Sequence, residues 1–230
     1  MFYSEKNVIE SCSDNPLLIF DLINREEFEL VDMLISKKIV NINTVDNNGN
    51  DVVTRLLKAK EYDLVLKYIK MRDWDINHQN NEGNTFAHYL VSTNYVHVVD
   101  IIKALKRRKN LIPNLKNSND ETILDKSINS NSIYATLKII EDKRFNNIDV
   151  ISFKKMYDKC IKNTNYGVYS KLNNLDIIVD SLGKKDVLLP GMKLLLDKIV
   201  ENKDLIKKNI KENNSKYFDE IIDNIVVQAS

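Results

Sequence analysis

The sequence predicts an all-α protein built from repeated pairs of short helices. Apolar residues recur with helical periodicity in short segments along the 230 residues, and polar turns separate these segments. The turns are evenly spaced: Asn43, Asn77, Asn114 and Asp149 follow one another at intervals of 34, 37 and 35 residues. A period of this length is typical of a repeat array, in which each helix pair is stabilised mainly by stacking on its neighbours.

Two further positions in the turns repeat with a similar period. Asp46, Asn80 and Asn117 share one polar position, and Gly49 and Gly83 lie 34 residues apart. Asparagine and aspartate side chains bond to their own backbone in turns, and glycine adopts positive φ without steric cost. The turns are therefore expected to share one conformation.

The order of the elements follows from the positions of these turns. Residues 1–14 are expected to form a short N-terminal cap, and residues 15–150 are expected to form about four helix pairs. Asn15 is predicted to be the N-cap of the first helix, because Pro16 suits the first helical position. The predicted pairs are Pro16–Ile23 with Glu26–Ser36, Asp51–Ala59 with Glu61–Met71, Thr85–Ser92 with Tyr95–Lys106, and Thr122–Ile128 with Ile133–Glu141.

Residues 151–230 keep the helical periodicity but lose the turn motif. They are interpreted either as a helical cap, which the exposed apolar face of a last repeat requires, or as a small separate helical domain. The helices predicted here are Ser152–Asn163, Tyr166–Leu182, Asp186–Asn202, Lys203–Lys211 and Tyr217–Val227.

The most distinctive motif covers residues 77–90, where a polar turn closes at Gly83 and Thr85 opens an apolar helix that contains His88. This stretch resembles the turn-and-helix signature of the ankyrin repeat, Thr-Pro-Leu-His-x-Ala, with Phe86 in place of the proline. A tetratricopeptide repeat has nearly the same period but lacks the Asn/Asp turn. The resemblance implies an ankyrin-repeat solenoid over residues 15–150 followed by a C-terminal helical region, with a structural histidine that bonds to neighbouring backbone.

The resemblance also implies a function, which is non-enzymatic protein–protein interaction through the turn tips and the first helix of each pair. Trp74, at the entry to a turn, is interpreted either as an interface anchor or as a side chain packed over the base of the hairpin. The residues expected to contact a protein partner are Asn47, Asn48, Asn50, Arg55, Trp74, Asn81, Glu82, Asn84, Tyr89, Ser118, Asn119, Glu121 and Lys126.

The sequence contains no motif typical of catalysis, phosphate binding or metal binding. There is no glycine-rich phosphate loop, no His/Cys cluster with metal-ligand spacing, and no nucleophile with a recognisable base. Cys12 and Cys160 are isolated and are predicted to be reduced thiols. We therefore expect no enzymatic activity, no catalytic residue, no cofactor and no metal.

Charge and hydropathy limit the partners and the location. The formal net charge of +1 argues against bulk nucleic acid or an acidic membrane as the partner. The basic run Lys106–Lys109 is expected to complement a helix C-terminus. No apolar run reaches the roughly 20 residues that span a bilayer, and no signal pattern opens the chain. A cytoplasmic location is therefore expected.

Two other functions remain open. The segment Val187–Val200 resembles the Leu-Pro and amphipathic helix that open an F-box, which would make the protein a ubiquitin-ligase adaptor. The abundance of Asn, Lys and Ile indicates an AT-rich genome and resembles ankyrin proteins of giant viruses or intracellular pathogens. A structural, virion-associated protein is the other alternative, and host cytoplasm is then the expected location.

Overall fold

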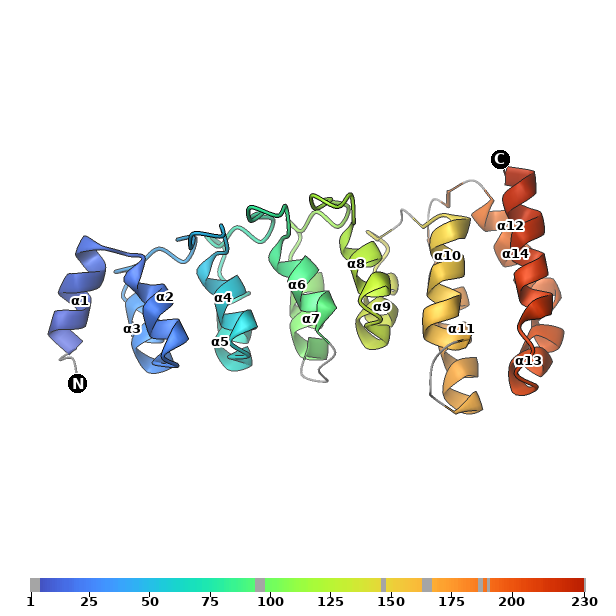
Figure 1. Ribbon diagram of the computed structural model, residues 1–230, viewed down its shortest axis with the longest axis horizontal. Helices are drawn as coiled ribbons and strands as arrows, with labels where there is room; N and C mark the ends of the chain where they lie inside the picture. The colour runs from blue at the N-terminus through green and yellow to red at the C-terminus, as the bar shows by residue number, and fades with distance from the viewer. Residues whose placement is uncertain are drawn as a thin grey trace. The chain divides into compact units, whose positions relative to one another are not determined.

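The prediction of an all-α protein is confirmed by the structure, a computed structural model that describes residues 5–93, 98–145, 148–162, 167–185, 188–189 and 191–229 (Figure 1). Over these residues the secondary structure is helical, and the only extended pairing is a single antiparallel bridge between Val45 and Asp51. None of the helices in this described part is long and apolar enough to cross a membrane.

The chain divides into two compact units, Met1–Thr122 and Ile123–Ser230. The first unit holds α1 (Glu5–Asp14), α2 (Leu18–Asn24), α3 (Phe28–Ser36), α4 (Val52–Lys58), α5 (Tyr62–Tyr68), α6 (Phe86–Ser92) and α7 (Val98–Lys106). The second unit holds α8 (Ile123–Asn129), α9 (Ile133–Ile140), α10 (Val150–Tyr157), a π-helical turn (Asp158–Lys162), α11 (Val168–Gly183), α12 (Met192–Glu201), α13 (Lys203–Lys211) and α14 (Lys216–Ala229). The division falls directly after Thr122, the first residue of the fourth predicted helix pair.

The first unit contains three helix pairs, α2 with α3, α4 with α5 and α6 with α7, and α1 packs on the first pair. The first helices α2, α4 and α6 pack one against the next, and α5 packs against α7. The core between them is fully buried at Val31, Leu56, Val65 and Leu90. The turns lie along one edge of the unit, and the helices of each pair extend away from them (Figure 1).

The helix bounds follow the predicted ranges closely, with two differences at caps. α2 begins at Leu18, and the Asn15 side chain accepts a hydrogen bond from the backbone N–H of Leu17 (3.2 Å), so Asn15 forms a turn before the helix and does not cap it. The spacing places Asp149 at the turn position of Asn43, but Asp149 directly precedes α10 and caps it by accepting from Ser152 N–H (2.7 Å). The predicted helix start at Tyr95 lies outside the described residues.

The second unit buries an aromatic and aliphatic core between α10 and α14, which includes Phe153, Tyr157 and Phe218. Lys185 closes the end of α9, because its ammonium donates to the carbonyl oxygens of Ile140 (2.8 Å) and Asp142 (2.6 Å). α12 begins at Met192, after Gly191 at φ 79°, and the predicted helix start at Asp186 lies outside the described residues.

Candidate functional site

The turns of the first unit share one hydrogen-bonding pattern. The side-chain oxygen of Asp46 accepts from the backbone N–H groups of Asn48 (2.9 Å) and Asn50 (2.8 Å). Asn80 and Asn117 accept in the same way from the residues two and four positions further on, at 2.9–3.0 Å. The fourth residue of each turn has positive φ, which is 76° at Gly49, 71° at Gly83 and 60° at Asp120. The expectation of one shared conformation is confirmed for these three turns.

Side chains also link each turn to the next. Asn80 Nδ2 donates to Asn50 Oδ1 (3.0 Å), and Asn117 Nδ2 donates to Asn84 Oδ1 (2.9 Å). Backbone bonds run alongside, from Asn81 N–H to Asn48 O (3.1 Å) and from Ser118 N–H to Glu82 O (3.0 Å). We call the series formed by Asp46, Asn50, Asn80, Asn84 and Asn117 the asparagine ladder. It fixes the spacing and orientation of neighbouring turns.

The ladder changes the interpretation of two residues expected to contact a partner. Asn50 is 2% exposed and Asn84 is 9% exposed, and both amides are used inside the ladder. A side chain that is buried and hydrogen-bonded offers a partner no contact surface. The structure therefore assigns Asn50 and Asn84 to the support of the turns and not to a binding surface.

The residues that follow the turns cap the starts of α4 and α6. The Asp51 carboxylate caps α4 by accepting from Thr54 N–H (2.6 Å), and Thr85 and His88 form a reciprocal capping box on α6. Because His88 Nδ1 accepts from Thr85 N–H (3.1 Å), its proton lies on Nε2, which donates to the carbonyl oxygen of Glu121 (3.0 Å). His88 therefore bonds to backbone of the following turn, as the family resemblance implied.

Trp74 belongs to the interior of the first unit. It is 1% exposed, its ring meets Phe86 edge-on at 5.1 Å, and its Nε1–H donates to Asp51 Oδ2 (2.8 Å). Burial raises the pKa of the Asp51 carboxyl, and the hydrogen bonds from Thr54 and Trp74 oppose that rise. Of the two roles considered for Trp74, packing fits this position, and an interface anchor does not.

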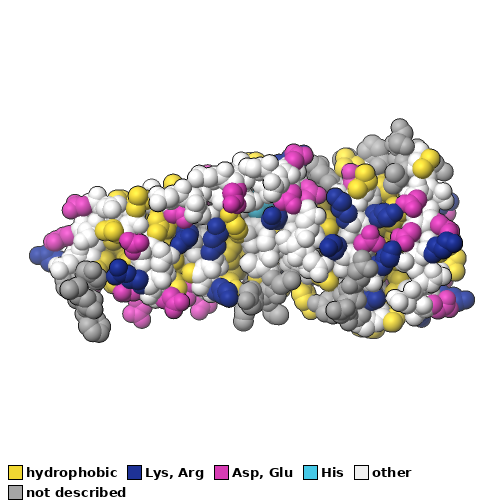
Figure 2. Space-filling model, in the orientation of Figure 1, with side chains coloured by type: hydrophobic (Ala, Val, Ile, Leu, Met, Phe, Trp, Pro, Cys, Tyr) yellow, Lys and Arg dark blue, Asp and Glu magenta, His cyan; other side chains and the backbone are white. Residues whose placement is uncertain are grey.

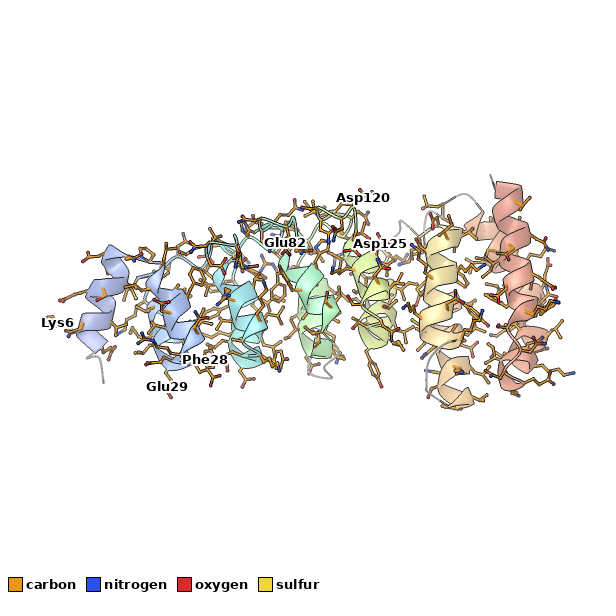
Figure 3. All side chains as sticks on the ribbon, viewed as in Figure 1. Lys6, Phe28, Glu29, Glu82, Asp120 and Asp125 are labelled. Atoms are coloured by element: carbon orange, nitrogen blue, oxygen red, sulfur yellow. The ribbon has the colours of Figure 1, made fainter. Side chains whose placement is uncertain are left out.

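The tips of the turns remain exposed. Asn47, Asn48, Asn81, Glu82, Ser118 and Asn119 are all exposed to solvent, and Glu121 is half-buried with its carboxylate accepting from Asn117 Nδ2 (3.0 Å). Glu82 and Asp120 mark the turn edge of the first unit in Figure 3. The structure therefore brings the exposed tip residues together along one edge.

The first helices contribute half-buried polar side chains beneath the tips. Arg55 donates to the Asn24 side chain and pairs with Asp46 (3.5 Å). Tyr89 accepts from Asn80 Nδ2 at its hydroxyl (2.7 Å), and the Lys58 ammonium lies 3.8 Å from the centre of its ring. Lysine and arginine side chains alternate with acidic ones on the face of this unit shown in Figure 2. Lys126, the third first-helix residue, is half-buried on α8 and belongs to the second unit.

Lys58 lies beside Arg55 and Tyr89, although the sequence pattern did not predict it as a contact residue. It lies three positions after Arg55 on α4, and residues three apart share one helix face. The Lys58 ammonium also donates to Asn50 Oδ1 (3.0 Å), so it joins the ladder to the Tyr89 ring. The helical spacing from Arg55 was the signal that could have identified it.

The basic run Lys106–Lys109 contains a structural arginine. Arg108 donates to three carbonyl oxygens, those of Ile69 (2.7 Å), Met71 (2.8 Å) and Trp74 (3.1 Å), where the chain leaves α5. Burial lowers the pKa of this guanidinium, and the nearby Asp75 carboxylate opposes the shift. The cation complements a helix C-terminus as expected, but the helix belongs to the preceding pair.

Replacing Arg108 with lysine is expected to lower the free energy of unfolding of the first unit by about 1–2 kcal/mol, because an ammonium cannot span three carbonyls as a planar guanidinium does. Urea denaturation followed by Trp74 fluorescence measures this loss. Arg107→Lys is the matched control, since Arg107 is exposed, and it is expected to stay within about 0.5 kcal/mol of the wild type. Equal effects of the two substitutions would contradict the assignment.

Metal ligands and thiols are the remaining groups that could carry chemistry. No group of three His, Cys, Asp or Glu side chains in the described part of the chain is placed to hold a metal ion. Cys12 and Cys160 are free and buried, and burial raises the pKa of both thiols, that of Cys160 to about 12. Thiols in such surroundings are poor nucleophiles.

Comparison with known proteins finds no protein-family model that matches the chain and no curated protein with significant similarity to it. The class of protein therefore rests on the repeated turns, the helix pairs and the exposed tip residues described above.

Proposed function

We propose that the protein is an ankyrin-type repeat protein whose first unit binds a protein partner through its turn tips. The tip surface is defined here as the exposed residues Asn47, Asn48, Asn81, Glu82, Ser118 and Asn119, together with Arg55, Lys58 and Tyr89 beneath them. The repeat length, the Thr85–His88 capping box and the bond from His88 to the next turn support the family assignment.

One observation carries the binding function. The side chains of Asn47, Asn48, Ser118 and Asn119 are exposed and make no hydrogen bond within the described residues, while the backbone that bears them is fixed by the ladder. Polar side chains on a rigid backbone bind with little loss of conformational entropy. A surface of this kind is therefore suited to recognition, and its own fold does not require those side chains.

The residues beneath the tips indicate how a partner would be held. Tyrosine and arginine are enriched among the residues that dominate binding energy, and Tyr89 and Arg55 lie half-buried on adjacent helices. The tip amides and hydroxyls would add hydrogen bonds at the edge of the contact. We expect the partner to present an extended polar surface that reaches across several turns.

The adaptor alternative receives no support from the position of α12. Four of its six apolar side chains, Met192, Leu195, Leu196 and Ile199, are buried, while Leu194 and Val200 are exposed, and α12 packs on α11, α13 and α14. A docking helix must offer its apolar face to a partner. No observation favours a virion-associated role.

The test compares two full-length variants with the wild type. In the tip variant, Asn47, Asn48, Ser118 and Asn119 are replaced with alanine; in the control, the same number of exposed residues on or near the second helices is replaced, namely Glu29, Asp63, Lys70 and Arg72. The partner is first captured with the wild-type protein, and its affinity for each variant is then measured by calorimetry.

The tip variant is expected to bind at least about tenfold more weakly, and the control is expected to bind within about twofold of the wild type. Neither set removes a hydrogen bond that the fold uses, so both variants should unfold at the wild-type temperature. A tip variant that is folded and binds normally would refute the proposed surface.

A further inference from the structure

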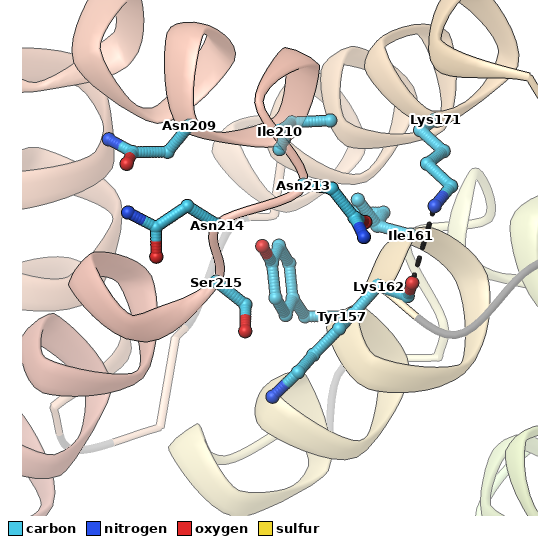
Figure 4. A pocket seen from close by; sticks show the side chains of 9 residues that line it. All are labelled: Tyr157, Ile161, Lys162, Lys171, Asn209, Ile210, Asn213, Asn214 and Ser215. Atoms are coloured by element: carbon cyan, nitrogen blue, oxygen red, sulfur yellow. Dashed lines mark hydrogen bonds between the residues drawn. The ribbon is translucent and has the colours of Figure 1, made fainter.

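The second unit contains a polar pocket that the proposed partner binding does not use. Its volume is about 280 Å³, and it lies where the chain passes from α13 to α14, against the end of the π-helical turn (Figure 4). The polar residues that line it and carry the argument are Tyr157, Lys162, Lys171, Asn213, Asn214 and Ser215.

The hydroxyl of Tyr157 is the first sign that the pocket is built for a ligand. Tyr157 is 2% exposed, and its ring stacks on Phe218 with 4.0 Å between ring centres. Its hydroxyl makes no hydrogen bond to any described residue and points toward the segment that carries Ile210 and Asn214 (Figure 4). Burial raises the pKa of Tyr157, and the carboxylates of Asp219 and Asp158 raise it further, so the hydroxyl keeps its proton. The hydroxyl therefore faces the open side of the pocket and offers a ligand a free O–H donor.

Other polar side chains at the pocket are also unpaired. The Asn213 amide and the Ser215 hydroxyl make no hydrogen bond within the described residues, and Asn213 has φ 55°. Asn214 only accepts a long bond from Lys216 N–H (3.3 Å), which leaves its amide N–H₂ free. Asn213 and Asn214 are exposed to solvent and Ser215 is half-buried, so these groups are free to bond to a ligand that enters the pocket.

The two lysines of the lining, Lys162 and Lys171, differ in their partners. Lys162 is balanced by Asp219 (2.8 Å) and Asp158 (3.8 Å). Lys171 donates only to the carbonyl oxygen of Lys162 (3.3 Å) and pairs with no carboxylate in the part of the chain that the structure describes. An anion placed beside Lys171 would therefore form its first ion pair and would meet several free N–H and O–H donors.

We propose that this pocket binds a small molecule bearing a carboxylate or phosphate group, with the anionic oxygens on Lys171 and a further polar atom on the Tyr157 hydroxyl. Pockets for drug-sized ligands usually span about 300–1,000 Å³. The smaller volume here indicates a ligand about the size of a single metabolite, and not a polymer.

The experiment titrates the isotope-labelled full-length protein with acetate, with inorganic phosphate and with neutral acetamide, and follows backbone amide shifts by NMR. Saturable shifts at residues 209–215 with at least one anion, and none with acetamide, are expected. A preference for acetate indicates a carboxylate ligand, and a preference for phosphate indicates a phosphate ester.

Three variants test the residues. Lys171→Gln is expected to weaken anion binding at least about tenfold, and Tyr157→Phe, which keeps the stacked ring, at least about threefold. Lys184→Gln, directly after the last residue of the same helix, is the matched control and should leave affinity unchanged, because Lys184 is exposed and pairs only with Asp180. No saturable response to either anion, equal binding of acetamide, or unchanged affinity in Lys171→Gln would each overturn the proposal.

Discussion

Replacing Trp74 with alanine is expected to lower the free energy of unfolding of the first unit by about 3–5 kcal/mol. The substitution removes a fully buried indole from its contact with Phe86 and leaves the buried Asp51 carboxylate without one of its donors. Single domains are stable by only about 5–15 kcal/mol, so the loss would unfold a measurable fraction of the first unit.

A second variant separates packing from hydrogen bonding. Trp74→Phe keeps an apolar ring but removes the N–H that donates to Asp51, and it is expected to cost about 1–3 kcal/mol. Urea denaturation followed by circular dichroism measures both variants. Tyr169→Ala is the control, because Tyr169 is 85% exposed, and it should change stability by less than about 0.5 kcal/mol. A Trp74→Ala protein as stable as this control would contradict the buried position of Trp74.

Replacing Gly83 with alanine is expected to cost about 2–3 kcal/mol, for two reasons. Gly83 has φ 71°, a conformation that costs an L-residue about 1–2 kcal/mol. A Cβ atom there would also lie 2.8 Å from the backbone nitrogen of Ser118, which donates to Glu82 O in the bond between neighbouring turns. The new atom would therefore push two turns apart.

Alanine substitutions at two other glycines provide comparisons for Gly83→Ala. At Gly49, which also has positive φ, the nearest atom to a new Cβ is the side-chain oxygen of Asn81 at 2.6 Å, which can move more easily than backbone. At Gly183, in α11, a Cβ meets nothing within 4 Å, and alanine should be neutral or slightly stabilising. The expected order of destabilisation is Gly83, then Gly49, then Gly183. Thermal unfolding of the three variants measures it, and a different order would refute the turn contacts described here.

Helix positions were predictable because they depend on local patterns. The predicted helix Lys203–Lys211 has the same bounds as α13, and the predicted pairs of the first unit agree with α2–α7 to within a few residues. Apolar periodicity marks the buried face of each helix, and Asp51 and Thr85 mark helix starts by capping.

The candidate binding surface was predictable only in part, because the neighbouring repeat determines whether a polar turn residue is exposed or buried. Asn48 and Asn50 are two residues apart and chemically identical, yet Asn48 is exposed and Asn50 is buried. The difference arises from Asn80, which is 30 residues away and donates to Asn50. Arg108 likewise bonds to carbonyls 34 to 39 residues earlier. A hydrogen-bond partner at that separation in the chain cannot be recognised from a local sequence pattern.

The asparagine ladder has a consequence for how such a chain can evolve. Asn50 and Asn84 are the same residue type in equivalent positions, and each accepts from the asparagine that begins the following turn. A tandem duplication of residues 50–83 would therefore place an asparagine at the new junction and supply the inserted turn with both a donor and an acceptor. The array could lengthen by one whole repeat in a single genetic event, without a second mutation to restore the hydrogen bonds between neighbouring turns.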